Sequence, residues 1–189
     1  MSDPSAKTQL VIQQSKAWLE QVVLAYELCP FARKPYDLEQ IRLIATPSRS
    51  LSELLQLVAE ECQLLVTTPS DEIETSLIIL ESALVDFRDY WSFVGEVENQ
   101  IYTTGLEGIL QVASFHPNYL FGGSTAKDPA NFTNRSPFPM LHLLREDSLS
   151  AALAHHKAPE QIPERNIALM REKGIQHWQQ LLSSIKQTT

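Results

Sequence analysis

Apolar residues recur along the chain with two different periods, which predict helices separated by short strands. Residues 9–27 have a helical period, and one face of that helix carries Val11, Trp18, Val22 and Tyr26. Pro30 should end this helix, because a proline cannot continue the ladder of backbone hydrogen bonds. Residues 41–46 have the length and the apolar content of a strand.

The middle of the chain predicts a helix, a central strand and a second helix. Ser50 and Glu53 have the spacing of a capping box, in which each side chain accepts a hydrogen bond from the other residue's backbone amide. The helix that they open has one apolar stripe, made of Leu51, Leu54, Leu55, Val58, Cys62 and Leu65. Residues 77–80 form an uninterrupted apolar run, which is typical of a central strand. Residues 84–101 return to a helical period.

A third strand and a long loop follow. Residues 109–115 have strand character, and residues 117–139 contain two adjacent glycines and four prolines. A loop of this length inside a compact domain is usually functional or mobile.

The last part of the chain leaves one alternative open. Residues 140–145 fit a fourth strand that leads into a helix capped by Asp147, which we favour, or the start of one helix over 140–156. Residues 163–186 predict the last helix. Gly174 lies on its apolar face and indicates close packing of the helix backbone rather than a break.

These elements predict one α/β or α+β domain over residues 1–189. We expect a small sheet of three to four strands covered by helices, with further helices at both termini. The first two strands are joined by a helix of suitable length, which favours a parallel crossover. Residues 1–8 are expected to be disordered, and residues 155–163 to link the body of the domain to the last helix.

Composition narrows the class of protein. The chain has 189 residues, of which 43% are hydrophobic and 20% charged, and its net charge is −8. A negative chain lacks the positive field that nucleic acids and anionic membranes attract, so we expect neither as a partner. Two cysteines exclude a disulfide-rich scaffold, and no apolar run is long enough to span a bilayer. We therefore expect a soluble cytoplasmic protein.

Three segments differ from ordinary helix and strand sequence. Residues 28–33, 115–119 and 134–146 each combine a proline-containing turn with reactive or charged side chains at the edge of a predicted element. Ligands of α/β proteins bind at the ends of strands. We therefore expect the three segments to meet in space.

The motifs LCPFA, SFHPNY, RSPFP and LHLLRE occur in this order, and together they resemble a family of bacterial and plant proteins, domain of unknown function family 1415. The resemblance covers most of the chain, from about the first helix to the region of His156. It implies no activity. Candidate residues therefore follow from their chemistry alone.

Cys29 is the first candidate. Arg33 and Lys34 lie close in sequence, and positive charge favours a reactive or metal-binding thiolate. The negative end of the preceding helix disfavours it. The turn is similar to the active turn of glutaredoxin-like proteins, but Ala32 stands at the second sulfur position. The alternative is a small buried residue at a helix end, and Cys62 is expected to lie in the core.

Two histidines are candidates for proton transfer. His116 closes a strand, where it would act as a general base or metal ligand, or else as a cap bonded to a loop carbonyl. His142 shares a face with Glu146 in a strand as in a helix, and a carboxylate can orient a histidine and raise its basicity. The alternative for His142 is a core residue.

Arg33, Arg135 and Arg145 are the candidates for anion binding. Arginines in proline-containing turns of a negative chain would form a fork for a carboxylate or phosphate, or alternatively a structural salt bridge or carbonyl clamp. Residues 122–125 would add backbone amides. The chain has no nucleotide-binding glycine motif and no G-x-S-x-G elbow.

Three hypotheses remain open. The first is an enzyme acting on a small anionic metabolite, with the three arginines binding the anion, His116 and His142 moving protons, Glu146 orienting His142 and Cys29 lining the pocket. The second is a transition-metal site made of Cys29, His116 and His142, although the chain has no recognised metal-binding spacing. The third is a non-enzymatic interaction module. Neither a cofactor nor an oligomeric state follows from the sequence.

Overall fold

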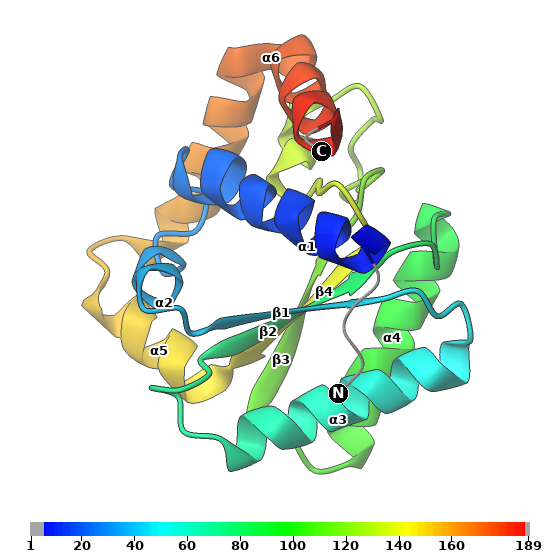
Figure 1. Cartoon of the computed structure of the whole chain (residues 1–189). Coiled ribbons are helices and arrows are strands. Elements are labelled where there is room, and N and C mark those ends of the chain that lie inside the picture. Colours follow the sequence, from blue (N-terminus) through cyan, green and yellow to red (C-terminus); the bar gives the residue numbers. More distant parts are fainter. Residues whose placement is uncertain (1–5, 188–189) are drawn as a thin grey trace.

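The centre of the computed structural model, which describes residues 6–187, is a mixed sheet of four strands in the order β1-β2-β4-β3 (Figure 1). The strands are β1 (Ile41–Thr46), β2 (Thr75–Leu80), β3 (Leu110–Phe115) and β4 (Met140–Arg145). β1 and β2 are parallel, and β4 lies antiparallel between β2 and β3. The α/β class with a small helix-covered sheet is confirmed. The carboxyl ends of β1, β2 and β3 therefore lie at one end of the sheet.

Two helices cover one face of the sheet, α3 (Leu51–Thr67) and α4 (Phe87–Thr103). The apolar stripe of α3 packs against β2 and β4, and Cys62 is buried in that layer as expected. Only half of the capping box forms. The Ser50 hydroxyl accepts from the Glu53 amide at 3.4 Å, whereas the Glu53 carboxylate accepts from the Ser48 hydroxyl at 2.6 Å.

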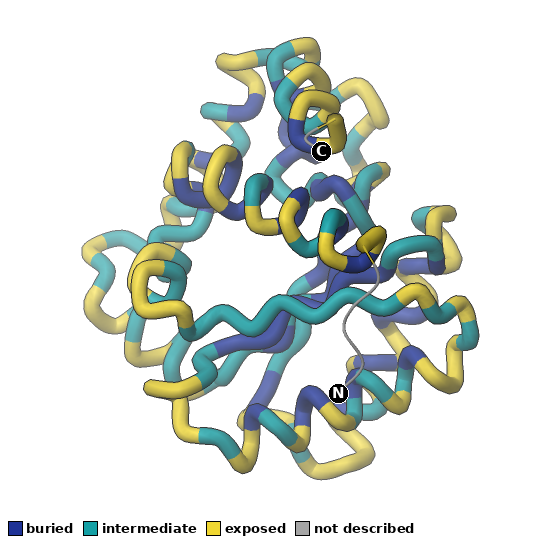
Figure 2. The backbone as a smooth tube through the Cα atoms, viewed as in Figure 1, coloured by how far each residue is buried: buried dark blue, intermediate teal, exposed yellow. Residues whose placement is uncertain are grey.

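The other face is covered by α1 (Ala6–Trp18) and the π-helical turn η1 (Leu19–Leu24), and α6 (Ile162–Gln187) packs against α1 in the same apolar cluster. Trp18 and Trp178 are the largest side chains in this layer, and both are fully buried. Figure 2 shows the result, with the buried strand β2 at the centre of the sheet, the edge strand β1 half-buried, and exposed residues on the outer sides of the helices. Burial of both sheet faces explains why all six residues of β2 are inaccessible to solvent.

The N-terminal helix differs from its predicted bounds. It begins at Ala6, so residues 6–8 are helical rather than disordered, and residues 1–5 lie outside the described chain. It ends with η1 at Leu24, before Pro30. Glu27 has a left-handed backbone with φ of 52°, so the chain leaves the helix through Glu27 and not at the proline. The short helix α2 (Arg33–Asp37) then leads to β1.

The favoured interpretation of the C-terminal region is confirmed, because β4 leads directly into α5 (Glu146–His155). Arg145 and not Asp147 holds the N-cap position. A 3-10 turn, η3 (Pro159–Gln161), separates α5 from α6. The expectation for Gly174 was wrong. Its φ of 78° and ψ of 162° break α6, and a Cβ there would meet no atom within 4 Å, so close packing does not explain the glycine.

The loop between β3 and β4 is built around one buried amide, that of Asn131 in the 3-10 turn η2 (Pro129–Thr133). Its Oδ1 accepts from the Phe121 amide at 3.0 Å and from the Ser124 hydroxyl at 2.8 Å. Its Nδ2 donates to the carbonyls of Thr125 and Asp128 at 2.8 and 3.1 Å. Four hydrogen bonds therefore tie the loop to one side chain.

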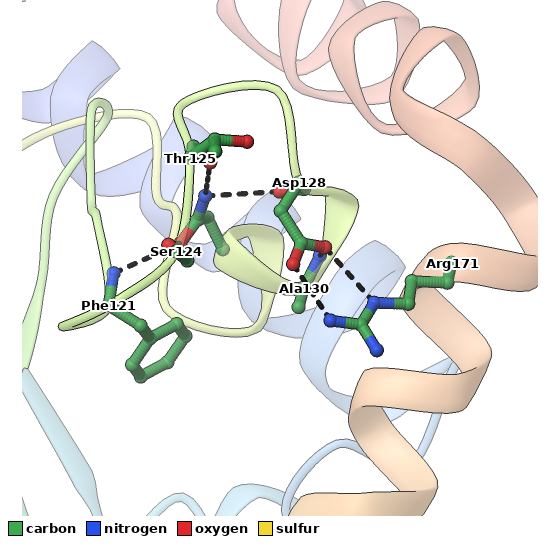
Figure 3. Close-up of polar contacts among 7 residues, drawn as sticks. Phe121, Ser124, Thr125, Asp128, Ala130 and Arg171 are labelled. Carbon is green, nitrogen blue, oxygen red and sulfur yellow. Dashed lines mark hydrogen bonds and ion pairs between the residues drawn. The ribbon is translucent and has the colours of Figure 1, made fainter.

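Asp128 connects the same loop to α6 (Figure 3). Its carboxylate accepts from the Ala130 amide and pairs with Arg171, whose Nε and Nη2 donate at 3.1 and 2.8 Å. The hydrogen bond from Arg171 is the largest cause that lowers the pKa of Asp128 below its usual range. The loop predicted as functional or mobile is thus anchored at both the Asn131 amide and α6.

Candidate functional site

Two of the three candidate segments meet at the carboxyl end of the parallel strands. The His116 amide donates to the Asn134 carbonyl at 3.1 Å, and the Asn134 side chain donates to the Ser114 carbonyl at 3.1 Å. β3 and β4 are paired as far as Phe115 and Met140, so the two segments leave the sheet side by side. This junction places His116 and Arg135 at one end of the sheet.

His116 is completely buried, and both of its ring nitrogens are occupied. Nδ1 accepts a hydrogen bond from the Asn118 amide at 3.0 Å, and Nε2 lies 3.1 Å from the Leu84 carbonyl. Because an amide can only donate and a carbonyl can only accept, the ring is the neutral tautomer with its proton on Nε2. Burial is the main cause that lowers the pKa of His116. The capping interpretation describes this geometry better than a general base or metal ligand.

The residue that His116 holds has an unusual backbone. Leu84 has a φ of 53°, in the left-handed region that branched side chains rarely adopt. It lies just before α4, whose N-cap Asp86 accepts from the Arg88 and Asp89 amides. Such strain persists only where the surroundings hold the backbone in place. The hydrogen bond with His116 is one of the interactions that hold it.

Aromatic rings surround this histidine. In this cluster, the centre of each ring lies within 6.3 Å of the centre of at least one other ring. The rings are those of Phe87, Tyr90, Trp91, His116, Tyr119 and Phe121. Tyr90 bridges the ends of β3 and β4, because its hydroxyl donates to the Met140 carbonyl at 2.7 Å and accepts from the Phe115 amide at 3.1 Å. Trp91 is 53% exposed, so the cluster reaches the surface. The hypothesis of a non-enzymatic interaction module stays a prediction, and this partly exposed aromatic cluster is the surface that such a module would use.

Arg135 is half-buried beside this cluster. Its guanidinium lies 4.5 Å from the centre of the Phe132 ring, and Nε and Nη2 donate to the carbonyls of Tyr119 and Ala126 at 3.3 and 3.2 Å. No carboxylate forms an ion pair with it anywhere in residues 6–187. Burial lowers the pKa of Arg135, but an arginine remains charged at neutral pH. The site therefore contains an oriented positive charge without an acidic partner.

The segment around Cys29 makes its contacts elsewhere. The Leu28 carbonyl accepts from the Asn166 side chain of α6 at 2.8 Å, and Phe31 packs edge-on against His156 at 5.8 Å. Within the described chain, no hydrogen bond or ring contact joins residues 28–33 to the side chains of His116 or Arg135. Cys29 is half-buried, and burial outweighs the amides of Phe31 and Ala32 and raises the pKa of its thiol. A raised pKa disfavours the nucleophilic thiolate.

His142 lies on the middle of the sheet, facing the α1 and α6 layer. Thr75 determines its tautomer: the Thr75 hydroxyl donates to the Leu143 carbonyl at 2.5 Å, so it accepts from His142 Nε2 at 2.7 Å. Burial lowers the pKa of His142 to about 4. A base with so low a pKa is nearly always neutral at pH 7 but accepts protons weakly.

Glu146 does not orient His142. The chain turns into α5 at this residue, whose amide donates to the Ile109 carbonyl at 3.0 Å. Neither a hydrogen bond nor an ion pair links the two side chains in the part of the chain that the structure describes. Instead, Glu146 lines a shallow groove of about 250 Å³ with two other glutamates, Glu98 and Glu107. The amino end of β3 is therefore acidic.

Arg145 and Arg33 do not join Arg135. Arg145 pairs with Leu110 across β4 and β3, at the opposite end of the sheet from Met140. Its Nη2 donates to the carbonyls of Thr68 and Ile73 at 2.7 and 2.9 Å, which is the predicted clamp alternative. Arg33 is exposed and lies 3.7 Å from Asp37 on α2. The three arginines thus do not form one fork.

A metal centre is not assembled from the predicted ligands. Within residues 6–187, no three His, Cys, Asp or Glu side chains are placed to hold a metal ion. The ring nitrogens of His116 are both engaged, and the segment that contains Cys29 is hydrogen-bonded to α6 through the Leu28 carbonyl. A larger groove of about 450 Å³ lies between α3 and α4 and is lined by none of the candidate residues.

Three residues that shape these sites were missed in the sequence. Phe132 lies under Arg135, Thr75 determines the tautomer of His142, and Leu84 accepts from His116. Thr75 and Leu84 lie far from their partners in the sequence, whereas Phe132 is only three residues from Arg135. Tyr119, whose carbonyl accepts from Arg135, was not a candidate either, but it lies inside the SFHPNY motif, which pointed to this end of the sheet.

Comparison with known proteins identifies a family but no activity. A family model described as "Protein of unknown function (DUF1415)" matches residues 10–180. No curated protein and no solved structure matches the chain. None of the helices within residues 6–187 combines the length and the apolar character needed to cross a membrane.

Proposed function

This chain belongs to the DUF1415 family, whose description names no activity, and we propose from its own geometry that it binds a small anionic molecule at Arg135. The single observation that carries the proposal is a half-buried guanidinium that is oriented by its surroundings and lacks an acidic partner within residues 6–187. Removing a positive charge from water costs free energy when no negative charge lies beside it. An anion from solution would supply the missing negative charge.

Other arginines of the chain provide the contrast. Arg42 donates to the buried Glu61 carboxylate at 2.9 Å, and Arg171 pairs with Asp128 at 2.8 Å. Their charges are therefore already balanced within the protein. Arg135 instead donates to two carbonyls, which direct the guanidinium without neutralising it. Arg145 is also held by two carbonyls without an ion pair, but it lies at the end of the sheet where Glu98, Glu107 and Glu146 line a groove. In a chain of net charge −8, Arg135 is the strongest candidate for attracting an anion.

The expected ligand is a small phosphate ester or carboxylate. Nε and one Nη2 hydrogen are used by the protein, and Nη1 donates to no group among the described residues. The planar guanidinium can therefore present its remaining hydrogens as two parallel bonds to an oxyanion. Residues 122–127, which are exposed except for Ser124, flank it, and Lys127 adds a second positive charge nearby in sequence.

The proposal assigns binding and not proton transfer to this end of the sheet. His116 uses both ring nitrogens, and the pKa of His142 is about 4. Neither histidine has the free nitrogen together with a pKa near 7 that efficient acid–base catalysis needs.

A thermal-shift screen tests the proposal. Phosphate monoesters and small mono- and dicarboxylates at about 10 mM should include compounds that raise the melting temperature of the wild type, because ligands that bind the native state stabilise it by mass action. The shift should disappear in Arg135→Lys, where a point charge replaces the planar fork.

Two control variants make this screen specific. Lys34→Ala removes an exposed charge, and Arg145→Lys changes a second carbonyl-clamping arginine at the opposite end of the sheet. Both should retain the ligand-induced shift. Equal loss in Arg135→Lys and in either control would indicate a diffuse charge effect and contradict the proposal, as would a screen in which no anion stabilises the wild type.

A further inference from the structure

We propose that the Arg135 site is pH-gated: it binds anions when His116 is neutral and loses affinity when His116 is protonated. This inference rests on the proposed function. The observation behind it is a chain of hydrogen bonds that leads from the His116 ring to the Arg135 guanidinium.

The first part of that chain is the His116 ring itself. It has no solvent exposure, and its ring centre lies 5.3 Å from that of Phe87 and 5.0 Å from that of Tyr90. Nε2–H donates to the Leu84 carbonyl while Nδ1 accepts from the Asn118 amide. The neutral ring thus connects the segment before α4 to the turn after β3.

The second part connects this turn to Arg135. The Tyr119 amide donates to the His116 carbonyl at 3.1 Å, and the Tyr119 carbonyl accepts from Arg135 Nε at 3.3 Å. From the other side, the His116 amide donates to the carbonyl of Asn134, the residue before Arg135. The position of the guanidinium therefore depends on the turn that His116 holds.

Protonation would break this arrangement at one atom. A charged imidazole carries a hydrogen on Nδ1, which would face the N–H of Asn118, so that two donors would oppose each other. The turn would have to move away from the ring. Leu84, with its φ of 53°, would also be free to relax when the ring shifts.

The charged and titratable groups around His116 come from several elements. Asp86 at the start of α4 favours the protonated ring, whereas Lys186 of α6 disfavours it, and Tyr90 and Tyr119 are the other titratable side chains in the surrounding cluster. Burial is the largest influence and favours the neutral ring. The switch should therefore operate below the ordinary histidine pKa of about 6.5.

The sign of the pH effect separates this inference from simple electrostatics. An added positive charge near Arg135 would by Coulomb attraction strengthen the binding of any anion. Loss of the turn predicts weaker binding instead. Sulfate is a suitable probe, since it remains fully ionised across this range and its own titration does not interfere.

The experiment measures sulfate affinity by calorimetry between pH 7.5 and 5.0. For the wild type we expect at least a tenfold loss on acidification, which is about 1.4 kcal/mol. In His116→Asn, the side-chain oxygen can still accept from the Asn118 amide but does not titrate, so the affinity should be nearly independent of pH. His155→Gln changes an exposed histidine and should behave as the wild type does.

NMR of the wild type provides a readout that needs neither a variant nor a ligand. At pH 7.5 the ring nitrogens of His116 should show the Nε2–H tautomer, and on acidification the Asn118 and Tyr119 amides should shift together with them. Protonation of His116 without movement of the Asn118 amide would overturn the gate while leaving anion binding intact. Affinity that rises steadily toward pH 5.0 would also overturn it, and absence of sulfate binding at every pH would overturn both proposals.

Discussion

The two ends of the sheet each hold an arginine on backbone carbonyls, yet only one of them has the properties of an anion site. Arg145 donates to the carbonyls of Thr68 and Ile73, next to a groove lined by Glu98, Glu107 and Glu146. Arg135 donates to the carbonyls of Tyr119 and Ala126, and its guanidinium lies 4.5 Å from the centre of the Phe132 ring. Neither arginine forms an ion pair within residues 6–187, so the two ends differ in the glutamates that gather at the Arg145 end and not in the geometry of the clamp.

The distance between the ends makes them independent. The six residues of β4 pair with β3 from Phe115 at one end to Leu110 at the other. A strand of this length spans roughly 17 Å. Substitutions that far apart and without shared partners usually have additive effects. Each end can therefore serve as the control for the other.

The largest difference is expected for one tyrosine at each end. Tyr90→Phe should reduce the free energy of unfolding by about 3 kcal/mol, because the Met140 carbonyl and the Phe115 amide would both lose a buried partner. Tyr102→Phe, at the acidic groove and 64% exposed, should change it by less than about 0.5 kcal/mol. Denaturant titrations measure both, and similar losses in the two variants would show that Tyr90 does not join the strand ends.

The dependence of stability on pH tests the histidine environments. Because burial lowers the pKa of His116 and sets that of His142 at about 4, the unfolded chain binds more protons than the folded one between about pH 4 and 6.5. Stability should therefore rise with pH through this window and be lost as the pH falls from 6.5 toward 4, by about 3 kcal/mol for His142. Denaturant titrations at several pH values measure it.

The variant His142→Gln isolates that contribution from the carboxylates. A glutamine amide can still donate to Thr75 but has no charge to gain, so the slope of stability against pH between 4 and 6.5 should decrease. An unchanged slope would mean that His142 is not the buried neutral group described here.

The cysteines are expected to differ by less. Cys62→Ala should cost about 1 kcal/mol, since it opens a small cavity between α3 and the sheet. Cys29→Ser, in a half-buried turn, should cost less and leave anion binding unchanged. A larger loss for Cys29→Ser in thermal unfolding would place that turn among the important packing elements.

The apolar pattern predicted the strands well, because each is a short, mainly apolar segment, and the fully buried β2 contains the longest uninterrupted apolar run of the four. Residues 41–46 and 140–145 form strands with the predicted bounds. The order β1-β2-β4-β3 did not follow from the pattern, since the insertion of β4 between β2 and β3 depends on long-range pairing. The break at Gly174 was missed because its apolar neighbours continue the helical period on both sides.

The candidate site was predicted only in part. The motifs located His116 and Arg135 at one end of the sheet, since each follows or precedes a strand that the pattern identified. Their partners could not be predicted. Leu84 lies 32 residues before His116. The carboxylates that pair with Arg171 and Arg42 come from distant elements, and no carboxylate within residues 6–187 pairs with Arg135. Hydrogen-bond partners and charge balance are properties of the folded chain.

The most direct test of the central claim is a calorimetric titration of sulfate at pH 7.5 into the wild type, Arg135→Lys and Arg145→Lys. The account predicts that the wild type and Arg145→Lys bind one sulfate with similar affinity and that Arg135→Lys binds at least about tenfold more weakly. Equal affinities in all three proteins, or a loss confined to Arg145→Lys, would contradict the claim that the unbalanced charge of Arg135 makes this end of the sheet an anion site.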